Sequence, residues 1–79
     1  MPKYKFVINP VPLKRNHKLF LKKLRERLLK NKIVFSYEYT TKEKSAKVIS
    51  NNAASKGYDI IVACGGDGTV MEVINGIYG

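Results

Sequence analysis

An unbroken apolar run that leads into a glycine-rich turn limits this chain to few folds. Residues 60–64 read Ile-Ile-Val-Ala-Cys, and residues 65–68 read Gly-Gly-Asp-Gly. A strand without polar alternation is typical of a parallel sheet that helices cover on both faces. In such open sheets, ligands bind outside the carboxyl ends of the strands. The run therefore predicts an α/β fold with a candidate site at this turn.

The rest of the chain alternates between the two periodicities of strands and helices. β-branched and aromatic residues predict strands, and apolar residues spaced three or four apart predict amphipathic helices. Pro10 and Pro12 should close the first strand, because proline cannot donate to a ladder. We predict strands at 4–9, 33–39 and 59–64, and helices at 14–32, 40–56 and from 69 onward. This β-α-β-α-β-α order predicts a three-layer α/β/α, Rossmann-like parallel sheet.

Two sequence patterns predict where helices begin. Thr40 and Glu43 are spaced as a capping box, and Gly57 is a natural stop for the helix that follows. Thr69 and Glu72 have the spacing of a second capping box. On this reading the glycine turn is structural, and Asp67 or Thr69 caps the third helix.

The chain is short for the fold that its pattern predicts. With 79 residues and 9.0 kDa it holds one domain at most, and a core of this size is marginally stable alone. The third helix is barely complete at Gly79. We therefore expect residues 1–79 to be a truncated part of a larger domain.

Positive charge is concentrated in the first half of the chain. The formal net charge is +9, and residues 1–33 hold eleven lysines and arginines against one acid, Glu26. Such a surface attracts nucleic acid, anionic lipid head groups or phosphorylated ligands alike. A lysine-rich helix face is also often simply solvated. Seven basic residues lie on the first predicted helix before position 30: Lys14, Arg15, Lys18, Lys22, Lys23, Arg25 and Arg27.

Cysteine usage and the N-terminus favour a cytoplasmic protein. Cys64 has no partner for a disulfide within the chain, and no Cys/His set has the spacing of a zinc site. The apolar stretch near Met1 is too short for a signal peptide or a membrane span. We expect a reducing compartment, with Cys64 as a small buried side chain.

The residues of the glycine turn suit phosphate chemistry. A helix that starts there directs free N–H groups and the positive end of its dipole at a ligand. Glycines allow close backbone approach. A bare carboxylate repels phosphate, so Asp67 fits such a site if a divalent cation bridges the two. Phosphate binding and a purely structural turn both remain open on spacing alone.

The same residues carry a family resemblance. Residues 65–69 (Gly-Gly-Asp-Gly-Thr), followed by Glu72-Val73 and Asn75-Gly76, closely resemble the diacylglycerol kinase catalytic domain signature GGDGTxNEVxNG. Asn9-Pro10 also resembles the family's first strand end. The family includes diacylglycerol and other lipid kinases of bacteria and the sphingosine and ceramide kinases of eukaryotes. The likeness covers the whole chain, although only the glycine motif is specific.

The resemblance implies an ATP-dependent kinase that phosphorylates a hydroxyl of diacylglycerol or a related lipid. It implies Mg²⁺ as a second cofactor, with Asp67 linked to the metal through water, and an anionic membrane surface as a partner of the basic helix at 14–30. The resemblance also makes residues 1–79 the N-terminal part of a nucleotide-binding catalytic domain. The family's catalytic base and its C-terminal β-rich domain lie downstream, so the resemblance implies that these residues alone are inactive. Carried over by position, the candidate ATP contacts are Asn9, Thr40, Gly65, Gly66, Asp67, Gly68, Thr69 and Glu72.

Two departures and two rival readings accompany the resemblance. Met71 stands where the family usually has asparagine, and Val11-Pro12-Leu13 replaces small residues. An NAD-kinase-like enzyme shares the glycine turn but not the continuation through Glu72 to Gly76. A non-enzymatic basic module would bind nucleic acid, which we consider an unfavoured partner, or another anionic surface. An unpaired sheet edge could also drive homo-oligomer formation.

Overall fold

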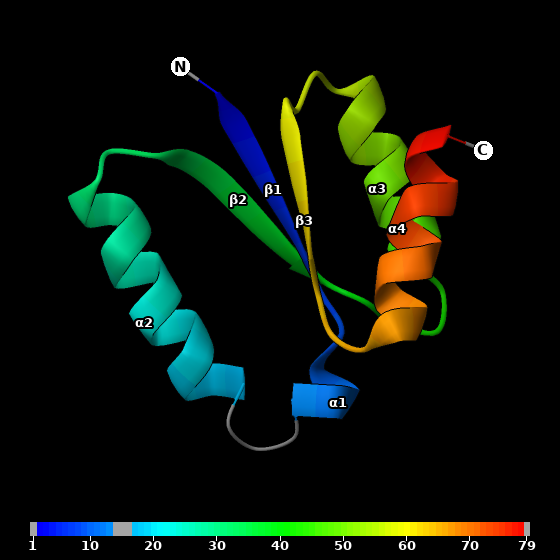
Figure 1. Ribbon diagram of the computed structural model, residues 1–79, viewed down its shortest axis with the longest axis horizontal. Coiled ribbons are helices and arrows are strands. Elements are labelled where there is room, and N and C mark those ends of the chain that lie inside the picture. The colour runs from blue at the N-terminus through cyan, green and yellow to red at the C-terminus, as the bar shows by residue number, and fades with distance from the viewer. Residues whose placement is uncertain (1, 14–16, 79) are drawn as a thin grey trace.

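The computed structural model describes residues 2–13 and 17–78 and shows an α/β fold with a parallel sheet (Figure 1). Strands and helices alternate as the sequence predicts, with one additional short helix. In chain order the elements are β1 (Lys3–Ile8), α1 (Pro10–Leu13), α2 (His17–Lys30), β2 (Val34–Tyr39), α3 (Ala46–Ser55), β3 (Ile60–Cys64) and α4 (Asp67–Tyr78).

The first strand forms the centre of the sheet. The strand order is β2-β1-β3, and Phe6 on β1 pairs with Tyr37 on β2 and Val62 on β3. Successive side chains of a strand point to opposite faces. Phe6 and its second neighbour Ile8 therefore pack toward α2, while Val7 between them packs toward α3 and α4.

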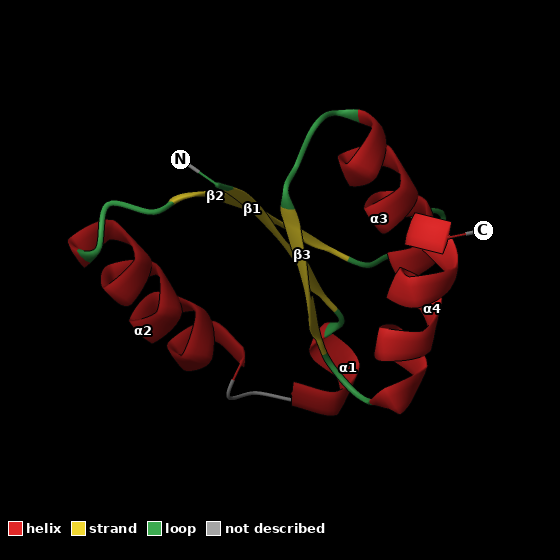
Figure 2. Cartoon of the chain, turned by 45° about the horizontal axis from the view of Figure 1, so that its top comes forward, coloured by secondary structure: helices red, strands yellow, loops and turns green. Residues whose placement is uncertain are grey.

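Two apolar clusters hold the three layers together. Figure 2 shows α2 on one side of the sheet and α3 and α4 on the other. On the α2 side, Phe6 and Ile8 meet Leu28. The cluster on the other side consists of Val7, Ala46, Ile49 and Val73. The predicted α/β/α layering is confirmed.

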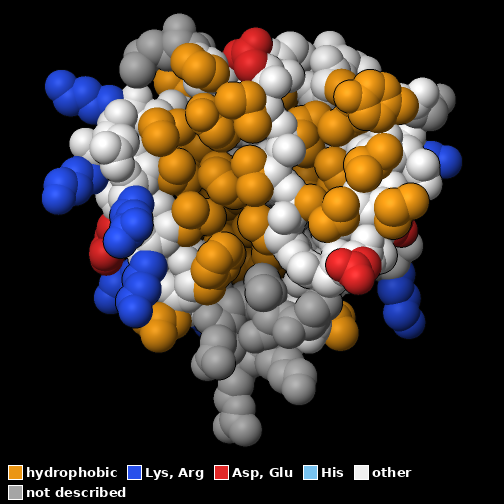
Figure 3. Space-filling view, viewed as in Figure 1, with side chains coloured by type: hydrophobic (Ala, Val, Ile, Leu, Met, Phe, Trp, Pro, Cys, Tyr) orange, Lys and Arg blue, Asp and Glu red, His pale blue; other side chains and the backbone are white. Residues whose placement is uncertain are grey.

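The third strand is less buried than its apolar run predicts. Within the described residues β3 pairs only with β1, so it is an edge strand; Ile60 is exposed and the following residues are half-buried. α4 is also apolar on its outer surface, where Met71 is 56% exposed. Figure 3 shows apolar side chains over the sheet and over α4, with Lys and Arg along the α2 side. None of the helices in the described ranges is long and apolar enough to cross a membrane.

The segment after β1 is helical. Pro10 and Pro12 do follow the strand, but they belong to the one-turn helix α1, which we did not predict. The Val11 N–H donates to Asn9 Oδ1 at 3.1 Å, so Asn9 starts the turn. Proline suits the first turn of a helix, because its missing N–H has no acceptor there. The next helix was predicted from Lys14; residues 14–16 lie outside the described residues, and α2 is described from His17.

Both predicted capping boxes are wrong. Ser45, with extended backbone angles, is the N-cap of α3, and its Oγ accepts from the Val48 N–H at 3.3 Å. Thr41 instead closes a local turn, in which its Oγ1 accepts from the Lys44 N–H at 2.9 Å. α4 begins at Asp67, so Thr69 lies inside that helix. The predicted stop at Gly57 is correct: its φ is 85°.

The corrected start of α3 leads to a simple test. We expect Ser45→Ala to lower the free energy of unfolding by about 1 kcal/mol, since an N-cap hydroxyl satisfies an otherwise unpaired helix N–H. Thr40→Ala should change it by less than about 0.5 kcal/mol. Urea unfolding followed by circular dichroism measures both. A larger loss for Thr40→Ala than for Ser45→Ala would contradict the assignment.

Candidate functional site

The carboxyl ends of all three strands meet at one edge of the sheet. The Asn9 N–H donates to Cys64 O at 2.8 Å, which ties the end of β1 to that of β3. The Thr40 N–H donates to Ile8 O, also at 2.8 Å, and so ties the end of β2 to β1. α1 and the start of α4 lie at the same edge, at the bottom of Figure 1. Parallel topology thus gathers the predicted site residues from three distant parts of the sequence.

The glycine turn passes directly into α4. Gly66 O accepts from the N–H groups of Thr69 at 3.0 Å and Val70 at 3.3 Å, so the first helical turn closes on the turn itself. The N–H groups of Asp67 and Gly68 stand at the helix start, where no preceding turn supplies acceptors. With the positive end of the helix dipole, they make this edge attractive to an anion.

The hydroxyl of the buried Thr69 links the glycine turn to the end of β1. Asn9 Nδ2 donates to Thr69 Oγ1 at 3.3 Å, and the Thr69 residue is only 3% exposed. Gly65 lies against this pair: a Cβ built on it would stand 2.5 Å from Thr69 Oγ1 and 3.1 Å from Asn9 Cβ. Asn9 and Thr69 therefore fix the position of the turn relative to β1, and Gly65 permits that close contact.

An open hollow of about 450 Å³ lies beside the start of α4. Five of the eight predicted ATP contacts line it, and they come from the end of β1, the glycine turn and α4. The lining residues are Asn9, Gly66, Gly68, Thr69 and Glu72. Gly65 lies against Thr69 and does not line the hollow. Asp67 is exposed at the first position of α4 and does not line it either. Thr40 is one strand further along the edge, beyond β1, and does not line it either.

Contacts between α3 and α4, which sequence reasoning missed, set the direction of α4. Ser50 is fully buried, and its Oγ donates to Val73 O at 3.3 Å. Asn51 Nδ2 donates to Gly76 O at 3.0 Å. A Cβ on Gly76 would collide with Ser50 Oγ and with the backbone oxygen of Lys47. The glycine in the Asn75-Gly76 part of the signature is thus explained by helix packing, which aims the start of α4 at the hollow.

No protein cage for a metal is present in residues 2–13 and 17–78, because these ranges contain no group of three His, Cys, Asp or Glu side chains that could hold an ion. Asp67 is the only carboxylate within the turn itself. This suits Mg²⁺, which commonly binds through one or two carboxylates together with waters and substrate phosphates. Cys64 is half-buried against the apolar cluster on the α2 side, and burial raises the pKa of its thiol.

Comparisons with known proteins agree with this geometry. A family model, the diacylglycerol kinase catalytic domain, matches residues 3–79. A diacylglycerol kinase of Staphylococcus haemolyticus (strain JCSC1435) is 50% identical over 38 residues, which make up 48% of this chain and 12% of that kinase. The matched part thus spans a small share of the relative's length. Because the family model extends over nearly the whole sequence, the chain belongs to the diacylglycerol kinase catalytic domain family.

Proposed function

We propose that this chain supplies part of the ATP site of a lipid kinase, which transfers the γ-phosphate of ATP to a hydroxyl of diacylglycerol or a related lipid. The observation that carries the proposal is the hollow where the glycine turn becomes α4, at the carboxyl edge of the sheet. Membership of a kinase family and the match to a diacylglycerol kinase support it. We assign residues 1–79 to the N-terminal part of the nucleotide-binding domain.

The proposed roles follow from the placement of each group. The N–H groups of Asp67 and Gly68 would donate to phosphate oxygens at the start of α4, and Gly66 would let the nucleotide approach the backbone. Asp67 would hold Mg²⁺ through water, and the ion would neutralise charge on the phosphates. Asn9 and Thr69 would keep the turn in place. We place the catalytic base and the lipid pocket outside these residues, so we expect nucleotide binding without phosphoryl transfer from them alone.

Calorimetric titration of ATP with and without Mg²⁺ tests the proposal. We expect Asp67→Asn to weaken binding in Mg²⁺ at least about tenfold, and to change binding without Mg²⁺ much less, because the lost charge acts through the metal. Asp59→Asn is the matched control: its carboxylate accepts from the Lys3 N–H at 2.8 Å near the opposite ends of the strands.

Two results would overturn the assignment. One is ATP binding that does not depend on Mg²⁺ or on Asp67. The other is affinity for nucleic acid that falls steeply with salt and is equal in Asp67→Asn and the unmodified protein, which would favour a basic binding module.

We further propose that the basic face of α2 meets an anionic membrane. Lys18, Lys22 and Arg25 are exposed and line a hollow of about 410 Å³ between α2 and β2, together with Leu21 and Leu29 among others. Basic groups beside exposed apolar side chains are typical of helices that lie in a membrane interface. Each basic group near an anionic surface contributes about 1 kcal/mol. Two further candidates, Lys14 and Arg15, lie outside the described residues.

Charge reversal tests the membrane proposal. We expect Lys22→Glu with Arg25→Glu to reduce binding to vesicles that contain anionic phospholipid at least about tenfold, and to leave the weak binding to neutral vesicles unchanged. The same reversal at Lys42 and Lys47, which are exposed elsewhere, controls for net charge. Vesicle co-sedimentation measures both. An equal loss for the two double variants would show that net charge alone, and not this face, drives binding.

A further inference from the structure

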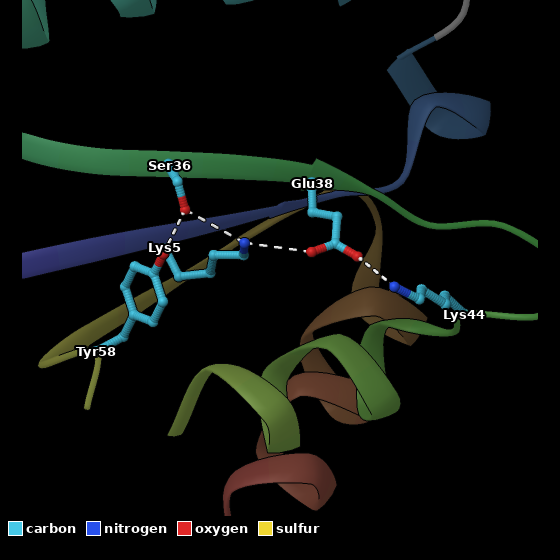
Figure 4. A network of polar contacts seen from close by, with 5 residues as sticks. All are labelled: Lys5, Ser36, Glu38, Lys44 and Tyr58. Carbon is cyan, nitrogen blue, oxygen red and sulfur yellow. Dashed lines mark hydrogen bonds and ion pairs between the residues drawn. The ribbon is translucent and has the colours of Figure 1, made fainter. Parts of the chain in front are cut away.

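A second polar pocket lies on the α3 side of the sheet, between β2 and α3. Its volume is about 60 Å³, and it is more enclosed than the hollow at the glycine turn. Figure 4 shows the polar network at its wall, which joins β1, β2, the segment before α3 and Tyr58, two residues before β3. The lining residues are Lys5, Glu38, Lys44, Ile49, Asn52, Ala53, Lys56 and Tyr58. None of them lines the hollow at the turn.

Lys5 is the anchor of this pocket. Its side chain is 13% exposed, and its Nζ lies 3.2 Å from Glu38 Oε1 and donates to Ser36 Oγ at 3.2 Å. Ser36 Oγ is in turn 2.8 Å from Tyr58 Oη. A lysine as buried as this one requires a counter-charge, because removing an ammonium from water is costly. The network therefore holds the Lys5 ammonium in one place at the pocket wall.

The pocket carries more positive than negative charge. Lys44 reaches the same carboxylate as Lys5, with its Nζ 3.6 Å from Glu38 Oε2, but its side chain is 60% exposed. Lys56 is a third cation in the lining, and Glu38 is the only acid there. The walls thus hold three ammonium groups and one carboxylate. Lys44 makes the longest of the contacts and is free to turn toward another anion.

Hydrogen bonds and nearby positive charge lower the pKa of two groups in this pocket, Glu38 and Tyr58. Burial alone would raise the pKa of Glu38, but the hydrogen bond and charge of Lys5, together with Lys44, hold it below its ordinary value of 4.5. The hydrogen bond with Ser36 is the largest influence on Tyr58, and with nearby lysines it lowers the pKa of Tyr58 against the effect of burial. Both directions mean that the hydrogen bonds and lysines around these two groups favour their anionic forms.

We propose that this pocket binds a small oxyanion of the phosphate class, at a site separate from the glycine turn. A phosphate dianion with three ammonium groups and one carboxylate brings the local charge to zero. Lys5, Lys44 and Lys56 supply charged donors, and the Asn52 amide supplies a neutral one. The volume of about 60 Å³ favours a small anion, because pockets for drug-sized ligands usually measure about 300 Å³ or more. The inference does not depend on the proposed nucleotide site.

Titration of the isotope-labelled protein with inorganic phosphate, followed by amide chemical shifts, tests the site residue by residue. We expect saturable shifts at Glu38, Asn52 and Tyr58, which are distinct from any shifts at the glycine turn. Lys44→Ala with Lys56→Ala should weaken the binding at this pocket at least about tenfold. Lys47→Ala, at an exposed lysine of α3 between the two changed positions, is the control and should leave the binding unchanged. Glu38→Gln removes the one repulsive charge and should tighten binding.

The possible outcomes distinguish specific phosphate binding in this pocket from nonspecific attraction to a positively charged surface. Pocket shifts that persist in Asp67→Asn and vanish in the Lys44/Lys56 variant support the proposal. Glycerol phosphate titrated in the same way distinguishes the ligand source: equal binding of the ester supports a site for a phosphorylated molecule, and binding of inorganic phosphate alone supports a site for the free anion. Three results would overturn it: shifts that sodium chloride reproduces at equal ionic strength, shifts that spread evenly over all lysines, or equal binding by the Lys47 and Lys44/Lys56 variants.

Discussion

Gly76→Ala is expected to lower the free energy of unfolding by about 3 kcal/mol, the upper end of what overpacking usually costs. Gly76 is buried where α4 crosses α3, and a Cβ there would collide with Ser50 Oγ and with the backbone oxygen of Lys47. Backbone atoms of a packed helix cannot move aside cheaply. The two helices must separate instead, which weakens the Asn51 Nδ2 to Gly76 O hydrogen bond of 3.0 Å and opens the core around Val73.

Gly68→Ala is the matched control, since it makes the same chemical change in the same helix. A Cβ on Gly68 meets no protein atom within 4 Å, so we expect stability to be unchanged or raised by at most about 1 kcal/mol through helix propensity. Urea unfolding followed by circular dichroism compares the two variants. Equal stabilities would mean that α3 and α4 do not pack as closely as described.

The fold was predictable because its strongest signals are local and periodic. The apolar run at 60–64 and the spacing of Leu21, Leu24 and Leu28 placed a strand and a helix within a few residues of their observed bounds. Parallel topology then followed from the alternation of the two periods. The family resemblance implied that Asn9 and Thr40 lie near the glycine turn, and backbone hydrogen bonds place all three at one edge of the sheet.

The start of α3 was predicted wrongly because several neighbouring residues have side chains that can cap a helix. Thr40, Thr41 and Ser45 are all able to cap a helix, and only the packing of Ala46 and Ile49 onto Val7 decides that α3 starts after Ser45. β3 has the composition of a central strand but lies at the edge of the described sheet, because strand order depends on long-range pairing. A single sequence does not contain that information in any local pattern.

The residues of the glycine motif have different structural roles, which the motif alone does not reveal. In the sequence Thr69 is a candidate ligand contact or a helix cap. In the structure it lies inside α4, is a buried partner of Asn9 and also lines the hollow. Gly66 and Gly68 line the hollow, whereas Gly65 does not line it and lies against Thr69. The three glycines of the motif thus differ: Gly65 permits close packing, whereas Gly66 and Gly68 keep the hollow open.

The packing role of Gly65 leads to the second prediction with a large expected effect. We expect Gly65→Ala to weaken binding of Mg²⁺-ATP at least about tenfold and to destabilise the protein by about 1–3 kcal/mol. The new methyl group would stand 2.5 Å from Thr69 Oγ1 and 3.1 Å from Asn9 Cβ, so it must displace the first turn of α4 from β1. The N–H groups that we propose to bind phosphate move with that turn. Calorimetric titration and urea unfolding measure the two losses.

A double-mutant cycle identifies the cause of those losses. Thr69→Ala removes the oxygen that the methyl group meets first, although Thr69 Cβ would still lie 3.0 Å from it. Gly65→Ala should therefore cost less stability in the Thr69→Ala background than alone, which is a coupling expected between residues in contact. Gly68→Ala should behave in the opposite way: it lines the hollow, so binding should fall while stability is kept. If Gly65→Ala and Gly68→Ala both bound Mg²⁺-ATP like the unmodified protein, the nucleotide could not lie over this turn.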